Sequence, residues 1–198
     1  MIAGAGFGAT LGQLVDARPA LKVLAVERDA ARFAYLRSNA AAWLVGGTQL
    51  MHAELGSSAL ASVDAAVREV ALDRVRLVVS TAGVAGPAML ASASGLCASS
   101  LPMLYFSCQI GGDAGGADAW RQQLRALWAC GYAGFWVLDN FGNPICEVSQ
   151  PRVMDQLLDS LLRQNQRRAS RTLYYYDVVA FSALDASRAA SAIDRHVS

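Results

Sequence analysis

Gly4-Ala5-Gly6-Phe7-Gly8 is the stretch that decides the fold class of this 198-residue chain, together with the later run Lys22-Val23-Leu24-Ala25-Val26-Glu27. Glycines at alternate positions let the backbone turn sharply and approach a ligand closely. The later run is continuously apolar until Glu27, which is typical of a parallel strand buried on both faces. We therefore predict a glycine turn before a helix, then a buried strand that ends in an acid. The glycines either form only a tight turn or line a ligand site.

Alternating strand and helix patterns continue along the chain. Further strands are expected over 48–51, 77–80, 103–108, 135–138, 145–148 and 173–181, and helices over 29–43, 58–70, 87–97, 117–130 and 151–165. This order predicts an α/β fold, a mostly parallel sheet with helices on both faces. Asp139 and Asn140 are expected to form the turn of a C-terminal antiparallel hairpin. The first strand is expected to be missing or very short, because the chain begins almost at the glycine loop. One domain is expected over 1–181, and an Ala-rich helical or frayed tail over 182–198.

The segment from Leu77 to Gly112 carries no charged residue and requires a test for a membrane span. A transmembrane helix needs about 20 consecutive apolar residues. Glycine, proline and serine interrupt this segment, for example at Gly86, Pro87 and Pro102. We therefore expect a buried strand, a helix and a second buried strand, and no membrane span.

Composition and charge narrow the classes of function. Hydrophobic residues make up 54% of the chain and charged residues 17%, which excludes a disordered polar chain. The net charge of +1 gives no electrostatic footprint for nucleic acid. The 4 cysteines lack Cys-x-x-Cys spacing, and only His52 and His196 could act with them as metal ligands, so we expect no metal site. We expect the cysteines to be buried free thiols, which indicates a cytoplasmic protein. All but one of the 17 basic residues are arginine, and alanine is abundant, which is typical of a GC-rich bacterial genome.

The glycine loop and the strand-terminal acid together predict a nucleoside site. Ligands of such sheets bind beyond the carboxyl ends of the strands, where Glu27 could accept hydrogen bonds from a ribose diol. Leu11 stands where a dinucleotide fingerprint has its third glycine, and no Lys-Ser/Thr pair follows for a nucleoside triphosphate. The pattern favours S-adenosylmethionine, which carries a sulfonium and no phosphate. The predicted cofactor-binding residues are Gly4, Gly6, Gly8 and Glu27.

Several segments, in order along the chain, resemble FkbM-type methyltransferases. The first is Ala25-Val26-Glu27-Arg28-Asp29 with Phe33, Leu36 and Asn39, which is similar to the cofactor segment of that family. The others are Ala53-Glu54-Leu55-Gly56, Thr81-x-Gly83, Pro102 to Phe106, Gly131-Tyr132, Asp139 to Asn143 and Tyr175 to Phe181. The resemblance covers roughly residues 2 to 181. It implies a Rossmann-like methyltransferase fold, S-adenosylmethionine as cofactor, and O-methylation of a sugar or other small-molecule hydroxyl.

The same resemblance shows where this chain departs from the family. Positions at which the family carries acids hold Ile2, Ser80, Ala82, Ala85 and Ser107. Methyl transfer to a hydroxyl needs alignment of the reacting atoms and usually a general base. Asp177, in a retained segment, is the remaining candidate for that base, at a site expected to form where the strands at Ser80 and Ser107 end.

Three functions remain open. The first is an active methyltransferase with a small-molecule substrate such as a saccharide. The second is a catalytically silent homologue that acts as a binding or scaffold partner in a polysaccharide or natural-product pathway. Both the active and the silent protein could form a homo-oligomer. The third, another Rossmann-type enzyme, is disfavoured by the glycine spacing.

Two further features have structural interpretations. His52 either stacks near an adenine or is a strand-end histidine. The arginines at 163, 167, 168 and 171 are interpreted as a solvated helix end.

Overall fold

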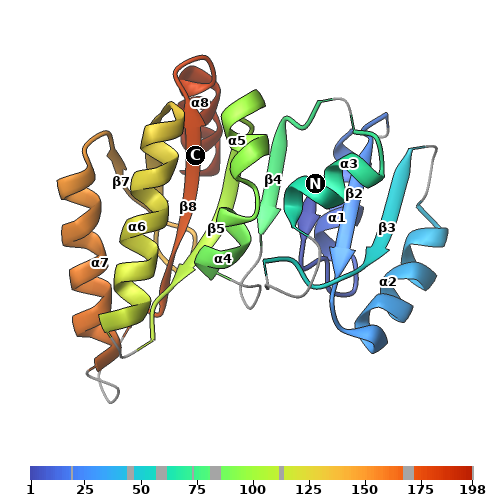
Figure 1. Cartoon of the computed structure of the whole chain (residues 1–198), viewed down its shortest axis with the longest axis horizontal. Helices are drawn as coiled ribbons and strands as arrows, with labels where there is room; N and C mark the ends of the chain where they lie inside the picture. The colour runs from blue at the N-terminus through green and yellow to red at the C-terminus, as the bar shows by residue number, and fades with distance from the viewer. Residues whose placement is uncertain are drawn as a thin grey trace. The chain divides into compact units, whose positions relative to one another are not determined.

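The computed structural model describes residues 1–18, 20–43, 47–56, 62–72, 74–80, 86–111, 114–166 and 172–197. The chain divides into two compact units, Met1–Leu96 and Cys97–Ser198, each with its own strands and helices. Figure 1 gives the labels of these elements.

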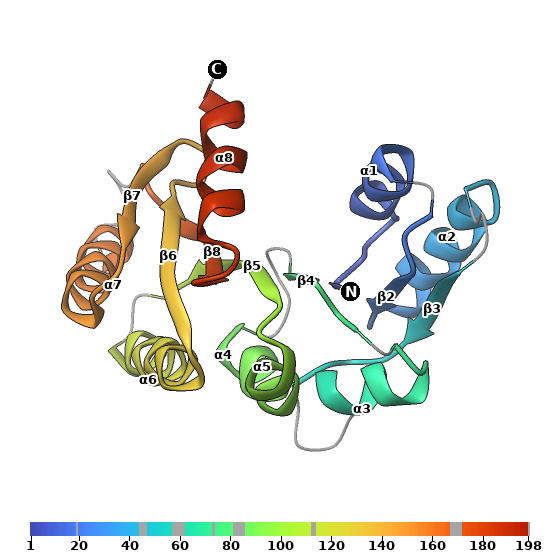
Figure 2. The ribbon, with the colours of Figure 1, turned by 90° about the horizontal axis from the view of Figure 1, so that it is seen from above.

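The described part of the first unit contains parallel strands in the order β3-β2-β1-β4. The strands are β1 (Ile2–Ala3), β2 (Val23–Glu27), β3 (Thr48–His52) and β4 (Leu77–Ser80). The helices are α1 (Ala9–Ala17), α2 (Ala30–Ala41), α3 (Val63–Glu69), α4 (Gly86–Ala91) and α5 (Ser94–Ser100), the last of which continues past the boundary of the unit. Figure 2 shows α1 and α2 on one face of these strands and α3 on the other.

The strand predicted from the run at 22–26 is confirmed as β2, and all of its residues are buried. α2 begins where predicted, because the Asp29 carboxylate accepts a hydrogen bond from the backbone N–H of Arg32 at 2.8 Å. The helix expected over 58–70 is α3, which follows its N-cap Ser62; the Ser62 hydroxyl accepts the N–H of Ala65 at 3.0 Å, and the expected start at residue 58 lies outside the described residues. The first strand is very short, as expected, since β1 has 2 residues.

The second unit contains strands in the order β5-β8-β6-β7, and each neighbouring pair is antiparallel. The strands are β5 (Met103–Gln109), β6 (Tyr132–Leu138), β7 (Pro144–Val148) and β8 (Tyr175–Ser182). The helices are α6 (Ala114–Cys130), α7 (Pro151–Gln166) and α8 (Ala186–Val197). β5 and β6 point the same way, because both are antiparallel to β8, which lies between them. Figure 2 shows α6 and α7 on one face of these strands and α8 on the other.

The predicted C-terminal hairpin is confirmed as β6 and β7, and Asp139 forms its turn. One carboxylate oxygen of Asp139 accepts hydrogen bonds from the N–H groups of Phe141 and Asn143, at 2.8 and 2.9 Å. Burial alone would raise the pKa of Asp139, but the hydrogen bonds from Asn143 and Phe141 outweigh it and hold the pKa below its usual value. Asn140 accepts the N–H of Tyr174 at 2.9 Å, so the turn also holds the segment before β8.

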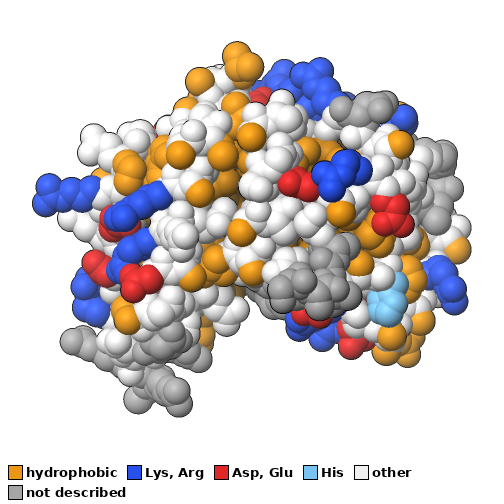
Figure 3. Space-filling view, in the orientation of Figure 1, with side chains coloured by type: hydrophobic (Ala, Val, Ile, Leu, Met, Phe, Trp, Pro, Cys, Tyr) orange, Lys and Arg blue, Asp and Glu red, His pale blue; other side chains and the backbone are white. Residues whose placement is uncertain are grey.

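Charged side chains join α6 to α7. Arg121 pairs with Asp118 on its own helix and with Asp155 and Asp159 on α7, and Arg125 binds Asp155 at 2.7 Å. Figure 3 shows these basic and acidic side chains together over the two helices.

α8 follows β8 after a short turn. The domain boundary expected at 181/182 stays a prediction.

The uncharged segment from Leu77 folds into β4, α4, α5 and β5 in its described parts, so the expectation of a single helix between the strands is wrong. The chain leaves α4 at Ser92, whose hydroxyl donates to the carbonyl of Met89 at 2.7 Å. α5 then starts afresh, because the Asp64 carboxylate accepts the N–H groups of Gly95 and Leu96, both at 2.8 Å. Within the described residues, no helix is long and apolar enough to cross a bilayer.

The four cysteines form no disulfide. Cys97 and Cys108 are buried as expected, but Cys130 and Cys146 are only partly buried, so the expectation of buried thiols holds for two of the four.

Replacing Gly56 with alanine should destabilise the first unit by about 3 kcal/mol or more. Gly56 has φ +88, and an added Cβ would lie 2.6–2.8 Å from the backbone of Ala88 and Met89 at the start of α4. Gly6→Ala is the matched control, because Gly6 has φ +56 but no described atom within 4 Å of the added Cβ. Urea unfolding should show a loss of about 1–2 kcal/mol for the control, the strain term alone. Equal losses in the two variants would contradict the contact.

Candidate functional site

The glycine loop lies at the carboxyl end of β1, between β2 and β4. The backbone N–H groups of Gly4 and Ala5 both donate to the carbonyl of Val26 at 2.9 Å, which folds the loop back onto the end of β2. Gly8 then begins α1 in the left-handed conformation, with φ 98. The chain runs from β1 to β2 on one side and returns to β4 on the other, so the loop occupies the switch point at which such sheets bind ligands.

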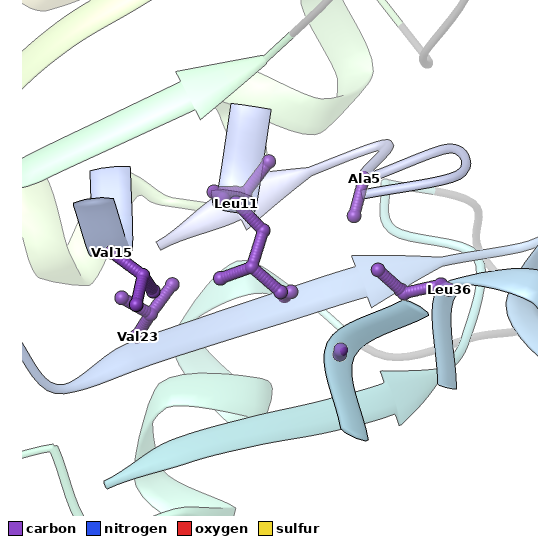
Figure 4. Close-up of a cluster of buried hydrophobic side chains, with 8 residues drawn as sticks. Ala5, Leu11, Val15, Val23 and Leu36 are labelled. Carbon is purple, nitrogen blue, oxygen red and sulfur yellow. The ribbon is translucent and has the colours of Figure 1, made fainter. Parts of the chain in front are cut away.

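An apolar cluster formed by α1, α2 and β2 packs against the glycine loop and holds it in place. Leu11 and Val15 of α1 pack with Val23 of β2, and Leu36 of α2 and Ala5 of the loop complete the contact, as Figure 4 shows. All five side chains are buried. The apolar periodicity of α1 and α2 is thus what holds the glycine loop against β2.

Glu27, the last residue of β2, holds the loop from the side. One carboxylate oxygen accepts the N–H of Gly6 at 2.7 Å, and the other accepts the N–H of Asp29 at 2.9 Å. The residue is only 4% exposed. Glu27 is therefore first a brace for the loop, a role that the sequence did not indicate. Each carboxylate oxygen can accept a second hydrogen bond, so acceptor capacity for ligand hydroxyls remains.

The space in front of Gly6 is open, and aromatic side chains stand beside it. No described atom lies within 4 Å of the position that a Cβ on Gly6 would take. Phe7 and Tyr35 form an edge-to-face pair with ring centroids 5.7 Å apart, and they are 56% and 60% exposed. The Asn39 amide donates to the carbonyl of Phe7 at 2.9 Å, which ties α2 to the loop. Tyr35 was missed in the sequence, although it lies one helical turn before Asn39.

His52 lies at the end of β3, next to the end of β2. Its Nε2 is 3.0 Å from the carbonyl oxygen of Arg28, so this nitrogen carries the proton that it donates. The ring stacks on Phe33 at 5.2 Å, and Arg28 forms an exposed ion pair with Glu54 at 3.6 Å. His52 is thus an exposed strand-end histidine, and the place of an adenine beside it stays a prediction.

Asp177 belongs to a polar cluster within the second unit. Asp177 on β8 lies directly opposite Ser107 on β5, and the Ser107 hydroxyl donates to its carboxylate at 2.6 Å. Tyr105, two residues back on β5, also hydrogen-bonds to Asp177, and burial together with the Asp177 charge raises the pKa of the Tyr105 hydroxyl. Asp177 is 9% exposed. The candidate base is therefore held by two hydroxyl donors, a contact that only the strand register reveals.

The other sequence-predicted positions are divided between the two units or undescribed. Ser80 is buried at the end of β4 in the first unit, whereas Ser107 belongs to the second, so their joint site stays a prediction. The other positions, residues 81–85 and the arginines at 167, 168 and 171, lie outside the described residues. Arg163 is exposed in the last turn of α7. No group of three or more potential metal ligands comes together in the described part of the chain.

Comparison with known proteins identifies the fold. No protein-family model matches the chain, and no curated protein matches its sequence. Among solved structures, fibrillarin from Aeropyrum pernix, with natively bound S-adenosyl-L-methionine, is similar with a TM-score of 0.56 and 11% identity, over 90% of this chain and 64% of that chain. This chain therefore spans slightly less than two thirds of the fibrillarin length.

Two further solved structures agree. The StiE O-MT (residues 942-1257) has a TM-score of 0.53 and 12% identity, over 92% of this chain and 67% of that one. The plantazolicin methyltransferase BamL, in complex with a triazolic desmethylPZN analog and SAH, has a TM-score of 0.52 and 10% identity, over 91% and 75%. The chain has the Rossmann-like methyltransferase fold. At these identities the likeness shows the fold and does not single out the FkbM family.

Replacing Glu27 with glutamine should lower the free energy of unfolding by about 1–3 kcal/mol, because an amide NH2 group then faces one of the two backbone N–H donors. Urea unfolding measures the change. Glu54→Gln is the control, since its exposed ion pair with Arg28 should contribute less than about 1 kcal/mol. A Glu27→Gln variant as stable as the wild type would show that Glu27 does not brace the loop.

Proposed function

We propose that this protein is a cytoplasmic bacterial methyltransferase that binds S-adenosylmethionine at the glycine loop. The observation that carries the proposal is the open space at Gly6 beside a loop braced by Glu27, at the switch point of a methyltransferase fold. Solved proteins of this fold contain S-adenosyl-L-methionine or SAH, which supports the choice of cofactor.

The residues of the loop fit this cofactor chemically. The loop backbone offers close approach without side chains, and Glu27 retains acceptor capacity for ribose hydroxyls. No lysine stands in the loop, and a cofactor without phosphate needs none. Phe33, in the first turn of α2, and His52, the last residue of β3, have stacked rings. These two rings would border the adenine.

For the reaction we propose O-methylation of a small-molecule hydroxyl, such as that of a saccharide. The resemblance to FkbM-type methyltransferases and the likeness to an O-methyltransferase structure support this choice. When bound, S-adenosylmethionine would supply an electrophilic methyl group: the substrate hydroxyl oxygen would bond to the methyl carbon as the carbon–sulfur bond breaks, with S-adenosylhomocysteine as the leaving group. The protein must align that hydroxyl and accept its proton. Asp177 is the proposed proton acceptor.

A catalytically silent homologue is the second candidate, and one observation favours it. Asp177 already accepts hydrogen bonds from Ser107 and Tyr105, so the protein itself takes up two of the about four acceptor positions of this carboxylate. FkbM-type methyltransferases carry an acid at the position of Ser107, so in this chain the cluster contains only one of the carboxylates expected there, that of Asp177. We therefore expect slow turnover or none, despite cofactor binding.

Titration calorimetry with S-adenosylmethionine tests the cofactor site. We expect saturable binding by the wild type, and at least about tenfold weaker binding by Gly6→Ala, whose methyl group enters the open space. Gly47→Ala is the matched control, because Gly47 also has a positive φ but lies before β3, away from the loop. It should bind like the wild type. Absence of heat at millimolar cofactor would reject the proposal.

Replacing Asp177 tests its role in turnover. If Asp177 accepts the proton, Asp177→Asn should lower kcat for methyl transfer to hydroxylated sugars by about 10²–10⁴-fold. Ser107→Ala should keep or raise kcat, because it vacates one acceptor position on the carboxylate. The exposed Asp118→Asn serves as control. If Ser107→Ala and Asp177→Asn lower kcat equally, the cluster is structural. Measurable wild-type turnover that Asp177→Asn leaves unchanged would reject both the silence and the role of Asp177.

A further inference from the structure

Asp177 lies on the face of the second unit's strands that is turned away from α6. Phe106 of β5 stacks on Trp120 of α6 with ring centroids 5.6 Å apart. Side chains alternate along a strand, so Tyr105 and Ser107, the neighbours of Phe106 on β5, point to the opposite face. Both hydroxyls hydrogen-bond to Asp177, which places its carboxylate on that face as well. This is the face on which α8 lies (Figure 2).

No basic side chain of the four strands balances the charge of Asp177. β5, β6, β7 and β8 contain two carboxylates, those of Asp177 and the exposed Glu147, and no lysine, arginine or histidine. α8 packs against β6 and β8 and carries two arginines. Arg188 pairs with Asp185 at 3.0 Å, and Arg195 is exposed. Within the described residues, Asp177 therefore has neutral hydroxyls as its side-chain partners and forms no ion pair.

A carboxylate that is 9% exposed and has neutral partners is complementary to a cation. The attraction between opposite charges grows as water is excluded, so it is stronger here than at an exposed acid. Aromatic rings add to it, because their faces are negative. Tyr105 hydrogen-bonds to Asp177, and Tyr175 on β8 lies close enough to Tyr105 to contribute to its raised pKa. Both tyrosines are half-buried, so the carboxylate has two aromatic neighbours.

The carboxylate also has acceptor capacity for the donors of such a ligand. It can accept about four hydrogen bonds, and Ser107 and Tyr105 use two of them. About two positions remain. A compound with an ammonium and a hydroxyl on neighbouring carbons can fill both, one with an N–H donor and the other with an O–H donor.

We propose that Asp177 binds the ammonium group of an amino alcohol such as an amino sugar. The ammonium lies against the carboxylate beside Tyr105, and the neighbouring hydroxyl takes the other free acceptor position. The proposal rests on the proposed methyltransferase function only in making this hydroxyl the methyl acceptor, because binding of the cation requires no cofactor.

Titration calorimetry of the full chain without cofactor tests the charge of the ligand. Glucosamine, below neutral pH where its amine is protonated, should bind at one saturable site. N-acetylglucosamine and glucose, which keep the hydroxyls and lack the charge, should bind at least about tenfold more weakly. Equal affinities for glucosamine and glucose, or no saturable binding of glucosamine, would overturn the proposal.

Variants locate the cation. Asp177→Asn, which keeps the shape of the side chain, should bind glucosamine at least about tenfold more weakly. Glu147→Gln removes the other carboxylate of the same four strands and should change the affinity less than about twofold. Ser107→Ala keeps the charge of Asp177 and frees an acceptor position, so it should bind glucosamine no more weakly than the wild type. Thermal unfolding checks that each variant folds. A loss in either of these two variants as large as in Asp177→Asn would overturn the assignment.

A transfer assay separates this proposal from the proposed function. If glucosamine binds at Asp177 and is not methylated in the presence of S-adenosylmethionine, the cation site stands and the proposed O-methylation fails. If glucose is methylated as fast as glucosamine, the methyltransferase function stands and the proposed amino alcohol substrate is overturned.

Discussion

The first unit depends on the two hydrogen bonds that the Glu27 carboxylate accepts from Gly6 and Asp29. β2 is buried along its whole length, so its single charge stands at the border of an apolar interior. A buried carboxylate is tolerated only where donors satisfy it. Backbone N–H groups provide those donors, and the same contacts fix where two helices begin. Gly6 leads to Gly8 at the start of α1, and Asp29 caps α2.

The parts of the fold that the sequence predicted correctly have local causes. The strand at 22–26 is predictable because continuous apolar residues leave no face for water, and Asp29 is a strong helix start whatever surrounds it. The β6–β7 hairpin likewise follows from Asp139, whose carboxylate closes the turn with its own neighbours. Of the candidate site, the loop and the acid at the end of β2 were predictable for the same reason.

The parts that were missed or wrong depend on residues far apart in the sequence. The helix expected over 87–97 is broken because Asp64, on a different helix, caps Gly95 and Leu96. The contact between Ser107 and Asp177 exists only through the register of β5 on β8. The hydrogen bonds by which Glu27 braces the loop were missed in the sequence. The sequence shows a glycine loop and a strand-terminal acid, but it does not show whether that acid faces the loop or a ligand.

Both carboxylates that the sequence marked as candidates for ligand or proton acceptance are thus already hydrogen-bonded within their own units. For Glu27 this favours binding, because a carboxylate held by two backbone donors keeps its orientation and loses little freedom when a ribose adds further hydrogen bonds. For Asp177 the same condition means that a substrate hydroxyl would share the carboxylate with Ser107 and Tyr105, which already donate to it. Ligand binding needs an acceptor that stays in place, whereas proton transfer needs one that is within reach of the substrate. The proposed cofactor binding thus relies on an acceptor that two backbone donors fix, whereas the proposed proton transfer relies on one that is shared with two neighbouring hydroxyls.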